Sequence, residues 1–373
     1  MSASPAVSPA RERELISASG RGDEAAFEQL VAPYRGELHA HCYRMLASVH
    51  DAEDAIQETL LRAWRAIGRF EGRSSLRSWL YTIATNTSLN LIAKRPKRVL
   101  PVDYGPRTDP HDGPGEPIVE SVWIEPYPDE RLGLDEGVAG PDASYELRES
   151  VELAFVAALQ HLAANQRAVL ILREVLGFSA AEVAETLGTT VASVNSALQR
   201  ARKSVEEKTP DQSQQATLRA LGDERLSEIV DGYVDAWLRG DVETVAAMLT
   251  EDATFAMPPL GSWFGTRAEI KEFLGRYPMN GTWRWQVVLT SANGGSPALG
   301  FYTWNEDEQA YLPFALNVLT FRGEQISDVV AFVSRSIEQT EREKYVRWPD
   351  EPADPDRLFS AFGQFGLPDR LEA

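Results

Sequence analysis

The spacing of apolar residues changes twice along the chain. Apolar positions recur at three- and four-residue steps before residue 98 and again from about residue 143, which predicts two helical blocks. Residues 101–142 lie between them and are rich in Pro, Gly and Asp, as is typical of a linker. After a break at KTPDQSQQ, a helical pattern gives way to strand-like alternation such as WRWQVVLTS at 283–291.

This pattern predicts a multidomain chain with two all-α domains followed by an α+β domain. The expected segments are 10–98 (helical), 99–149 (acidic Pro/Gly-rich linker), 150–208 (helical), 217–335 (α+β) and 336–373 (tail). With 373 residues, of which 43% are hydrophobic, the chain can form several cores.

Charge is distributed unevenly among these segments. The net charge is -19, which by itself disfavours nucleic-acid binding, because affinity for phosphates comes from Lys and Arg. Residues 1–98 nevertheless carry a net charge of +3, whereas the linker carries -10. From Arg62 to Arg98 there are nine Lys or Arg and one acidic residue, Glu71. We therefore expect a DNA-sized basic patch within an acidic protein.

Residues 51–70, DAEDAIQETLLRAWRAIGRF, predict an amphipathic helix. Its apolar stripe comprises Ala52, Ile56, Leu60, Ala63, Trp64 and Ile67. The opposite face is polar except for Leu61, which lies one turn from Gln57 and Glu58. This face is either solvated with one exposed leucine or a surface that binds a partner protein.

Residues 70–98 predict a Gly/Ser turn followed by a helix with aromatic and basic side chains. The basic residues that could hold phosphates are Arg73, Arg77, Lys94, Arg95, Lys97 and Arg98. Aromatic rings together with Asn86 and Asn90 could contact unpaired bases. The alternative is that Trp79, Leu80 and Ile83 are core residues and the basic end is solvated.

The segments DAEDAIQETLLRAW and FEGRSSLRSWLYTIATN resemble region 2 of the extracytoplasmic-function sigma factors of the sigma-70 family, over residues 24–98 without a gap. In that family the first helix binds the clamp of the RNA polymerase β′ subunit, and the next helix melts and reads the minus-10 promoter element. The resemblance implies polymerase contacts at Asp54, Gln57, Glu58 and Leu61. It implies minus-10 contacts at Arg73, Arg77, Trp79, Asn86, Asn90 and Lys94.

Residues 159–205 predict a helix-turn-helix without reference to any family. Ser179 and Glu182 form a capping-box pattern at the start of one helix, and Gly188 ends it. The expected contacts between the two helices are Val183, Leu187, Val191, Val194 and Leu198. The expected DNA-facing residues are Ser193, Asn195, Ser196, Gln199, Arg200, Arg202 and Lys203.

This block also resembles a domain of the same family. NQRAVLILREVLGFSAAEVAETL and SVNSALQRAR are similar to region 4, which reads the minus-35 element and touches the polymerase β flap. LAANQR departs from the usual LPxxQR, which we expect to affect the helix start more than DNA contact. In related sigma factors the linker passes near the polymerase active cleft, and we hypothesise the same path here. Ordinary disorder is the alternative.

Residues 217–335 resemble the SnoaL-like, NTF2-like cone-shaped α+β fold, in which a curved sheet wraps a helix. That fold includes enzymes, ligand-binding modules and dimerising modules, so it does not by itself establish a function. The resemblance implies a regulator in cis, with a small-molecule ligand as one expectation. Candidate pocket residues are Phe255, Trp263, Tyr302, Trp304 and Phe314, although all five could simply be core.

The candidate chemistry favours a protein that is not an enzyme. Asp252 and Asp307 are the candidate acids of the α+β domain, but Asp307 lies in NEDEQ, which is typical of a solvated turn. His39, His41 and Cys42 fall short of the four ligands of a closed zinc site, so we expect no metal or cofactor.

These observations favour a sigma factor whose partners are core RNA polymerase and promoter DNA. The alternatives are a stand-alone helix-turn-helix regulator, which has no use for residues 51–98, and an NTF2-like enzyme with a DNA-binding appendage. No apolar run could form a signal peptide or membrane span, and the single cysteine cannot form an internal disulfide. We therefore expect a cytoplasmic protein with no membrane partner.

Overall fold

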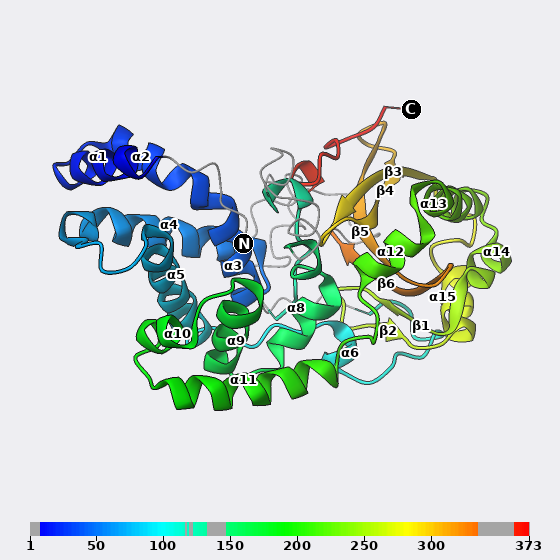
Figure 1. Ribbon diagram of the computed structural model, residues 1–373. Coiled ribbons are helices and arrows are strands. Elements are labelled where there is room, and N and C mark those ends of the chain that lie inside the picture. Colours follow the sequence, from blue (N-terminus) through cyan, green and yellow to red (C-terminus); the bar gives the residue numbers. More distant parts are fainter. Residues whose placement is uncertain (1–7, 116–117, 119–121, 133–146, 335–361, 373) are drawn as a thin grey trace. The chain divides into compact units, whose positions relative to one another are not determined.

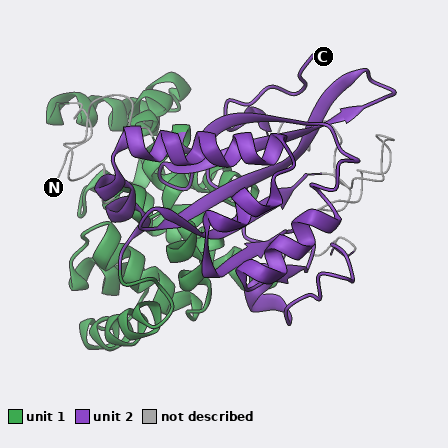
Figure 2. Ribbon diagram, turned by 90° about the vertical axis from the view of Figure 1, so that its right-hand side faces the viewer, with its two compact units in different colours: residues 1–97, 130–211 green, residues 98–129, 212–373 purple. Residues whose placement is uncertain are grey.

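The computed structural model describes residues 8–115, 118, 122–132, 147–334 and 362–372. The chain forms two compact units (Figure 2). Unit 1 comprises residues 1–97 and 130–211, and unit 2 comprises residues 98–129 and 212–373. Unit 1 therefore contains both helical blocks, and unit 2 contains the α+β domain.

The first half of unit 1 is a bundle of helices (Figure 1). These are α1 (Pro9–Gly20), α2 (Glu24–Val31), α3 (Arg35–Leu46), α4 (Val49–Ala66) and α5 (Leu76–Ile92), with 3-10 turns at Ala32–Tyr34 and Ile67–Arg69. The hydroxyls of Ser48 and Ser75 cap α4 and α5 by accepting backbone N–H groups. The predicted stripe of α4 is buried except for Trp64, which is half-buried and packs edge-on against Phe27.

The second half of unit 1 is the predicted helix-turn-helix with two helices before it. They are α8 (Leu153–Gln160), α9 (Ala164–Leu170) with a π-helical turn (Ile171–Val175), α10 (Ala180–Thr186) and α11 (Val191–Glu206). The capping box is confirmed, since Ser179 and Glu182 each accept the other's backbone N–H. Helix α9, which starts within LAANQR, begins without a side-chain cap. Val191 was expected between the helices, but it is the first residue of α11 and is 44% exposed.

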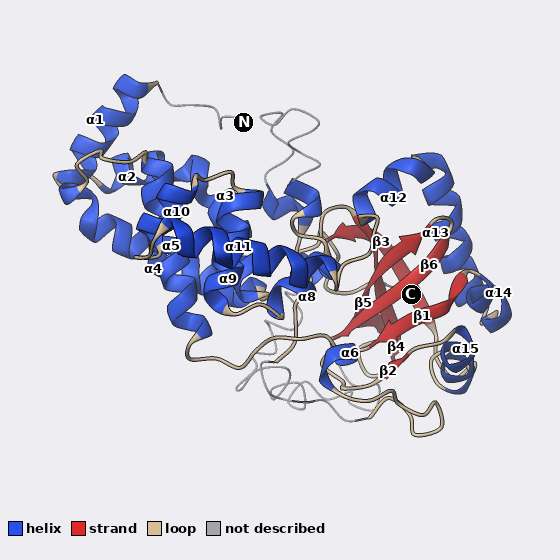
Figure 3. Ribbon diagram, turned by 60° about the horizontal axis from the view of Figure 1, so that its bottom comes forward, coloured by secondary structure: helices blue, strands red, loops and turns tan. Residues whose placement is uncertain are grey.

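Unit 2 is an α+β domain, which confirms the predicted fold class (Figure 3). Its helices are α6 (Pro101–Tyr104), α12 (Gln214–Leu221), α13 (Asp223–Leu238), α14 (Val242–Ala247) and α15 (Arg267–Arg276). Its strands are β1 (Leu249–Ala256), β2 (Trp263–Phe264), β3 (Trp285–Ala292), β4 (Ser296–Asn305), β5 (Ala310–Arg322) and β6 (Gln325–Val333). They form one sheet in the order β2-β1-β6-β5-β4-β3, in which only the β1–β6 pair is parallel.

The two faces of this sheet bury different partners. The inner face packs against α13 and α15 around an aromatic core. In this core the ring centroids of Trp237 and Phe301 lie 4.8 Å apart. The outer face packs against a short segment near the C-terminus, through Phe362, Phe365 and Leu367. Both faces are therefore covered by parts of the same chain.

The connection between the two helical blocks behaves differently from an independent linker. Its first part, residues 98–129, is built into unit 2. Thr108 N–H donates to the carbonyl of Trp263 at 2.9 Å, and Trp263 Nε1 donates to the carbonyl of Gly105 at 2.9 Å. The rest of the connection, residues 133–146, lies outside the described residues.

Candidate polymerase and promoter interfaces

Helix α4 presents the residues that the resemblance assigned to polymerase. Asp54, Gln57 and Leu61 are exposed, and Leu61 keeps 42% of its surface exposed. Glu58 is half-buried and accepts from Arg62 Nε at 2.6 Å. The four therefore form a surface face in which one apolar side chain lies among polar neighbours.

The sequence did not predict a contact of Glu53, which also lies on α4. Arg131, from the 3-10 turn Asp129–Leu132, donates to Glu53 Oε2 at 2.8 Å and lies 3.0 Å from His39 Nε2. Burial alone would raise the pKa of the Glu53 carboxyl, but Arg131 outweighs burial and lowers it. Burial, aided by Arg131, lowers the pKa of His39 to about 4. A residue 78 positions away from Glu53 in the chain leaves no local signal in the sequence.

Helix α5 separates the minus-10 candidates into exposed and inward-facing residues. Asn86, Asn90 and Lys94 are exposed, and Arg73, in the preceding turn, is exposed and paired with Glu71. Arg77 instead donates to Glu37 at 2.8 Å and lies over the Tyr81 ring at 4.8 Å. Trp79 is half-buried, with its ring 5.1 Å from that of Phe70.

The basic residues that follow α5 are less available for binding phosphates than the sequence indicated. Arg95 pairs with Asp51 and lies 3.8 Å from Asp54. Arg98 is buried, because its guanidinium donates to the Trp123 carbonyl at 2.7 Å and lies near Glu125. Of the six basic residues suggested as phosphate ligands, Arg98 is therefore not at the surface.

Helix α11 displays all seven minus-35 candidates. Ser193, Asn195, Ser196, Gln199, Arg200, Arg202 and Lys203 are exposed, while Val194 and Leu198 face the interior. Arg202 pairs with Glu174 at 2.7 Å, and Lys203 lies 4.0 Å from Glu207. The helix thus offers base-reading amides and phosphate-binding cations on one surface.

The structure brings α5 and α10 into contact, although they belong to different helical blocks. Ser78 donates to Glu182 Oε1 at 3.3 Å, and the hydroxyl oxygens of Thr82 and Thr186 lie 3.0 Å apart. Phe178 packs edge-on against Tyr81 with 5.4 Å between ring centroids. In this arrangement α5 and the helix-turn-helix are held together.

Buried polar groups join the same two blocks elsewhere. Arg167 is 4% exposed and donates to the Met45 carbonyl and to Gln160. Burial lowers the pKa of Arg167 to about 10. Arg44 is fully buried and donates to the carbonyl and hydroxyl of Ser150. Removing either cation would take hydrogen bonds away from buried oxygen acceptors.

The five candidate pocket aromatics do not come together in unit 2. Phe255 and Phe314 belong to the inner face of the sheet, whereas Tyr302 belongs to the outer face. Trp263 contacts Arg107 and the Gly105 carbonyl, and Trp304 packs on Tyr311. Successive side chains of a strand point to opposite faces of the sheet, so aromatic residues that the sequence suggested as one pocket are placed apart.

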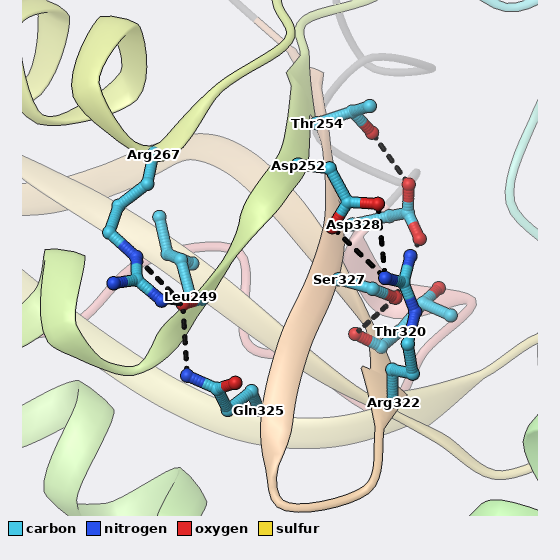
Figure 4. Close-up of polar contacts among 9 residues, drawn as sticks. All are labelled: Leu249, Asp252, Thr254, Arg267, Thr320, Arg322, Gln325, Ser327 and Asp328. Carbon is cyan, nitrogen blue, oxygen red and sulfur yellow. Dashed lines mark hydrogen bonds and ion pairs between the residues drawn. The ribbon is translucent and has the colours of Figure 1, made fainter.

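The carboxylates of unit 2 are arranged as surface ion pairs and hydrogen bonds (Figure 4). Asp252 binds Arg322 through both oxygens at 3.0 Å, and this pairing lowers the pKa of the Asp252 carboxyl. Asp328 accepts from Thr254 at 2.6 Å. Asp307 is exposed in a turn, as expected. Asp252 is therefore poorly suited to act as a general acid, because that role needs a raised pKa.

Among the residues that the structure describes, no group of three His, Cys, Asp or Glu side chains is placed to hold a metal ion. His41 is fully buried and bonded to Thr85 at 2.9 Å, and Cys42 is a buried free thiol whose pKa burial raises to about 12. None of the described helices is long and apolar enough to span a membrane.

Comparison with known families matches three parts of the chain. Residues 30–98 match sigma-70 region 2, residues 152–205 match sigma-70 region 4, and residues 230–329 match the SnoaL-like domain. The match to region 2 disfavours the stand-alone regulator, which has no use for that block.

Individual relatives agree with these matches. The chain is 39% identical to the ECF RNA polymerase sigma factor SigG of Mycobacterium tuberculosis, over 94% of this chain and 85% of SigG. It is 28% identical to SigW of Bacillus subtilis, over 53% of this chain and 97% of SigW. The crystal structure of Mycobacterium tuberculosis SigJ has a similar fold, with a TM-score of 0.51 at 22% identity over 86% of this chain and 97% of SigJ. This chain therefore belongs to the extracytoplasmic-function RNA polymerase sigma factors and carries a SnoaL-like domain at its C-terminal side.

Proposed function

We propose that this sigma factor binds core RNA polymerase through the exposed face of α4 formed by Asp54, Gln57, Glu58 and Leu61. The observation that supports it best is Leu61, a large apolar side chain that is 42% exposed beside the polar Gln57. An exposed apolar residue within a polar rim is the arrangement of a small binding hot spot. The partners are the polymerase β′ clamp for α4 and the β flap for the helix-turn-helix.

We assign the minus-10 element to Arg73, Asn86, Asn90 and Lys94, with Trp79 as an adjoining aromatic. Their exposure supports this assignment. Arg77 is kept apart from this set, because its Nε and Nη2 groups donate to Glu37. The minus-35 element is assigned to the seven exposed residues of α11, with Asn195 and Gln199 reading bases and Arg200 and Lys203 holding phosphates.

The test is transcription in vitro from a promoter library with bacterial core polymerase. We expect promoter-specific transcripts that depend on this protein and that fall at least tenfold with Gln57→Ala/Leu61→Ala. The matched control is Leu238→Ala, which removes a leucine of similar exposure, 44%, from unit 2. Promoter-specific DNA binding without any transcription would contradict the proposal and favour a stand-alone regulator.

The SnoaL-like domain regulates the sigma domains in cis by holding the connection between regions 2 and 4. Support comes from residues 98–129, which belong to unit 2. The N–H groups of Gly294 and Gly295 donate to the Asp129 carboxylate at 2.6 and 2.7 Å. Tyr127 and Asn293 exchange two further hydrogen bonds at 3.0 and 2.8 Å. Both glycines have positive φ, so this carboxylate-binding turn requires glycine.

Asp129→Ala removes the carboxylate from this turn and tests the regulatory role. We expect transcription output to change at least threefold in either direction, because the connection is held less firmly on unit 2. Asp112→Ala is the control, since Asp112 is exposed in the same segment. Unchanged output, together with unchanged protease protection of the connection, would remove the basis for regulation through this contact.

A small-molecule ligand of the SnoaL-like domain is a second proposal, which rests on two buried polar atoms. Trp237 Nε1 and Asn317 Oδ1 have no hydrogen-bond partner among the described residues. Asn317 is paired with Leu299 and Ala331, so its side chain lies on the inner, apolar face. Asn317→Leu should raise the melting temperature if Asn317 is kept for a ligand, because it removes an unpaired acceptor. A lower melting temperature would indicate a structural role instead.

A further inference from the structure

The outer face of the unit 2 sheet is covered by a segment that is separate from the rest of the domain in the sequence. Phe362, Phe365 and Leu367 are buried against side chains of β3, β4 and β5, among them Tyr302 and Leu316. Residues 335–361 lie between β6 and this segment. We call the covering segment (residues 362–372) the C-terminal plug. It does not follow directly after a strand of the sheet, so its position on the sheet depends on its contacts.

The sheet is shaped to receive this plug. Gly300, in the middle of β4, lies opposite Leu367, and a Cβ at Gly300 would come within 2.7 Å of a Leu367 methyl group and 3.4 Å of the Phe362 ring. Glycine weakens the interior of a strand unless something must approach its backbone closely. The close approach of Leu367 therefore gives a physical reason for glycine at this position.

Polar contacts fix the plug in one register. The hydroxyls of Thr290 and Tyr302 donate to the carbonyls of Phe365 and Pro368 at 2.7 and 2.8 Å. At the end of the plug, Tyr311 and Leu371 exchange two backbone hydrogen bonds of 2.9 Å. The sheet thus recognises both the side chains and the backbone of the plug, as a peptide-binding surface does.

We propose that the outer face of this sheet is a docking site for the C-terminal plug and that a second copy of the chain can supply the plug, so that two copies associate by exchanging plugs. The intervening residues 335–361 can reach at most roughly 90 Å, which is enough to span to a neighbouring molecule. Exchange uses the same contacts in both states, so it needs no new interface.

Complementary variants of the full chain test this exchange. One variant ends at residue 361 and keeps an empty face. The other, Gly300→Val, keeps the plug and blocks the face, while valine favours the strand conformation and should preserve the sheet. Neither can exchange plugs alone, but the Gly300→Val chain can donate its plug to the truncated chain. Sedimentation velocity of the mixture should show a species of twice the monomer mass in a 1:1 ratio.

Two control variants show whether a complex in the mixture depends on the plug. Adding Phe365→Asp to the Gly300→Val chain disables the plug and should abolish the complex. Gly363→Ala should behave as the unmodified chain, because a Cβ there meets nothing within 4 Å. If truncation unfolds unit 2, a full-length Phe365→Asp/Leu367→Asp chain replaces it as the variant with an empty face. Folded variants that remain separate monomers when mixed would overturn the proposal, even if a peptide of residues 362–373 bound the empty face.

Discussion

Thr82 of α5 and Thr186 of α10 lie with their hydroxyl oxygens 3.0 Å apart, although 104 residues separate them in the chain. With the neighbouring pairs Ser78–Glu182 and Tyr81–Phe178, this contact joins the proposed minus-10 helix to the helix-turn-helix. If α5 and α11 read two separate promoter elements, as proposed above, this contact must open for both elements to be bound.

A disulfide between positions 82 and 186 should lock this contact. The two hydroxyl oxygens lie 3.0 Å apart, so sulfur atoms at these positions need to approach by only about 1 Å more to form a disulfide. Oxidised Thr82→Cys/Thr186→Cys should show at least tenfold less promoter-dependent transcription, with recovery after reduction. Each single variant serves as control, and Cys42 should not interfere because it is buried. Full activity of the oxidised double variant would show that opening between α5 and α10 is unnecessary.

Replacing Leu61 should separate polymerase binding from stability. Leu61→Ala alters a residue that is 42% exposed, so the free energy of unfolding should change by no more than about 0.5 kcal/mol. Affinity for core polymerase should fall about tenfold, which corresponds to about 1.4 kcal/mol. Calorimetry and a competition binding assay measure the two quantities. A loss of stability that matches the loss of binding would point to a structural role.

Two substitutions in α11 should have different signatures on DNA. Arg200→Ala should weaken binding of polymerase holoenzyme evenly across promoter sequences and reduce the salt dependence by about one counterion. Gln199→Ala should relax preference at one base pair of the minus-35 element by about 1–3 kcal/mol. Arg202→Ala is the comparison, because Glu174 already neutralises Arg202. Binding titrations at several salt concentrations distinguish these outcomes, and equal effects of all three variants would contradict the assignment.

Unit 1 should lose stability below neutral pH through two buried histidines. Burial lowers the pKa of His39 to about 4 and that of His41 to about 3, from 6.5. The unfolded chain therefore binds more protons below pH 6.5, so the stabilising contribution is complete above that pH and is lost as pH falls towards the folded values. His39 alone should cost about 2 kcal/mol between pH 7 and pH 5.

The measurement is denaturant unfolding of the chain at a series of pH values. His39→Gln should flatten the profile between pH 7 and pH 5. Arg131 and Glu53 also face His39, so Arg131→Met should shift the profile by raising the pKa of His39. A profile that His39→Gln leaves unchanged would assign the pH dependence to other groups.

Local features of this protein were predictable from the sequence. The capping box of Ser179 and Glu182, the apolar stripe of α4 and the exposed face of α11 depend on residues within a few turns of one another. Their periodicity and capping chemistry act over the same short range. The family motifs lie in these same helices, which explains why the predicted fold class agrees with the structure.

The local sequence was sufficient to predict the main helices of unit 1 and the faces that they expose to solvent, because helix capping and apolar spacing are local. Only the tertiary structure decided that Arg77 pairs with Glu37, that Arg131 contacts Glu53, and that residues 98–129 dock on the SnoaL-like domain. It also divided the five candidate pocket aromatics between two faces of the sheet. These contacts join residues tens to hundreds of positions apart, and they arise from packing complementarity that no short window of sequence contains.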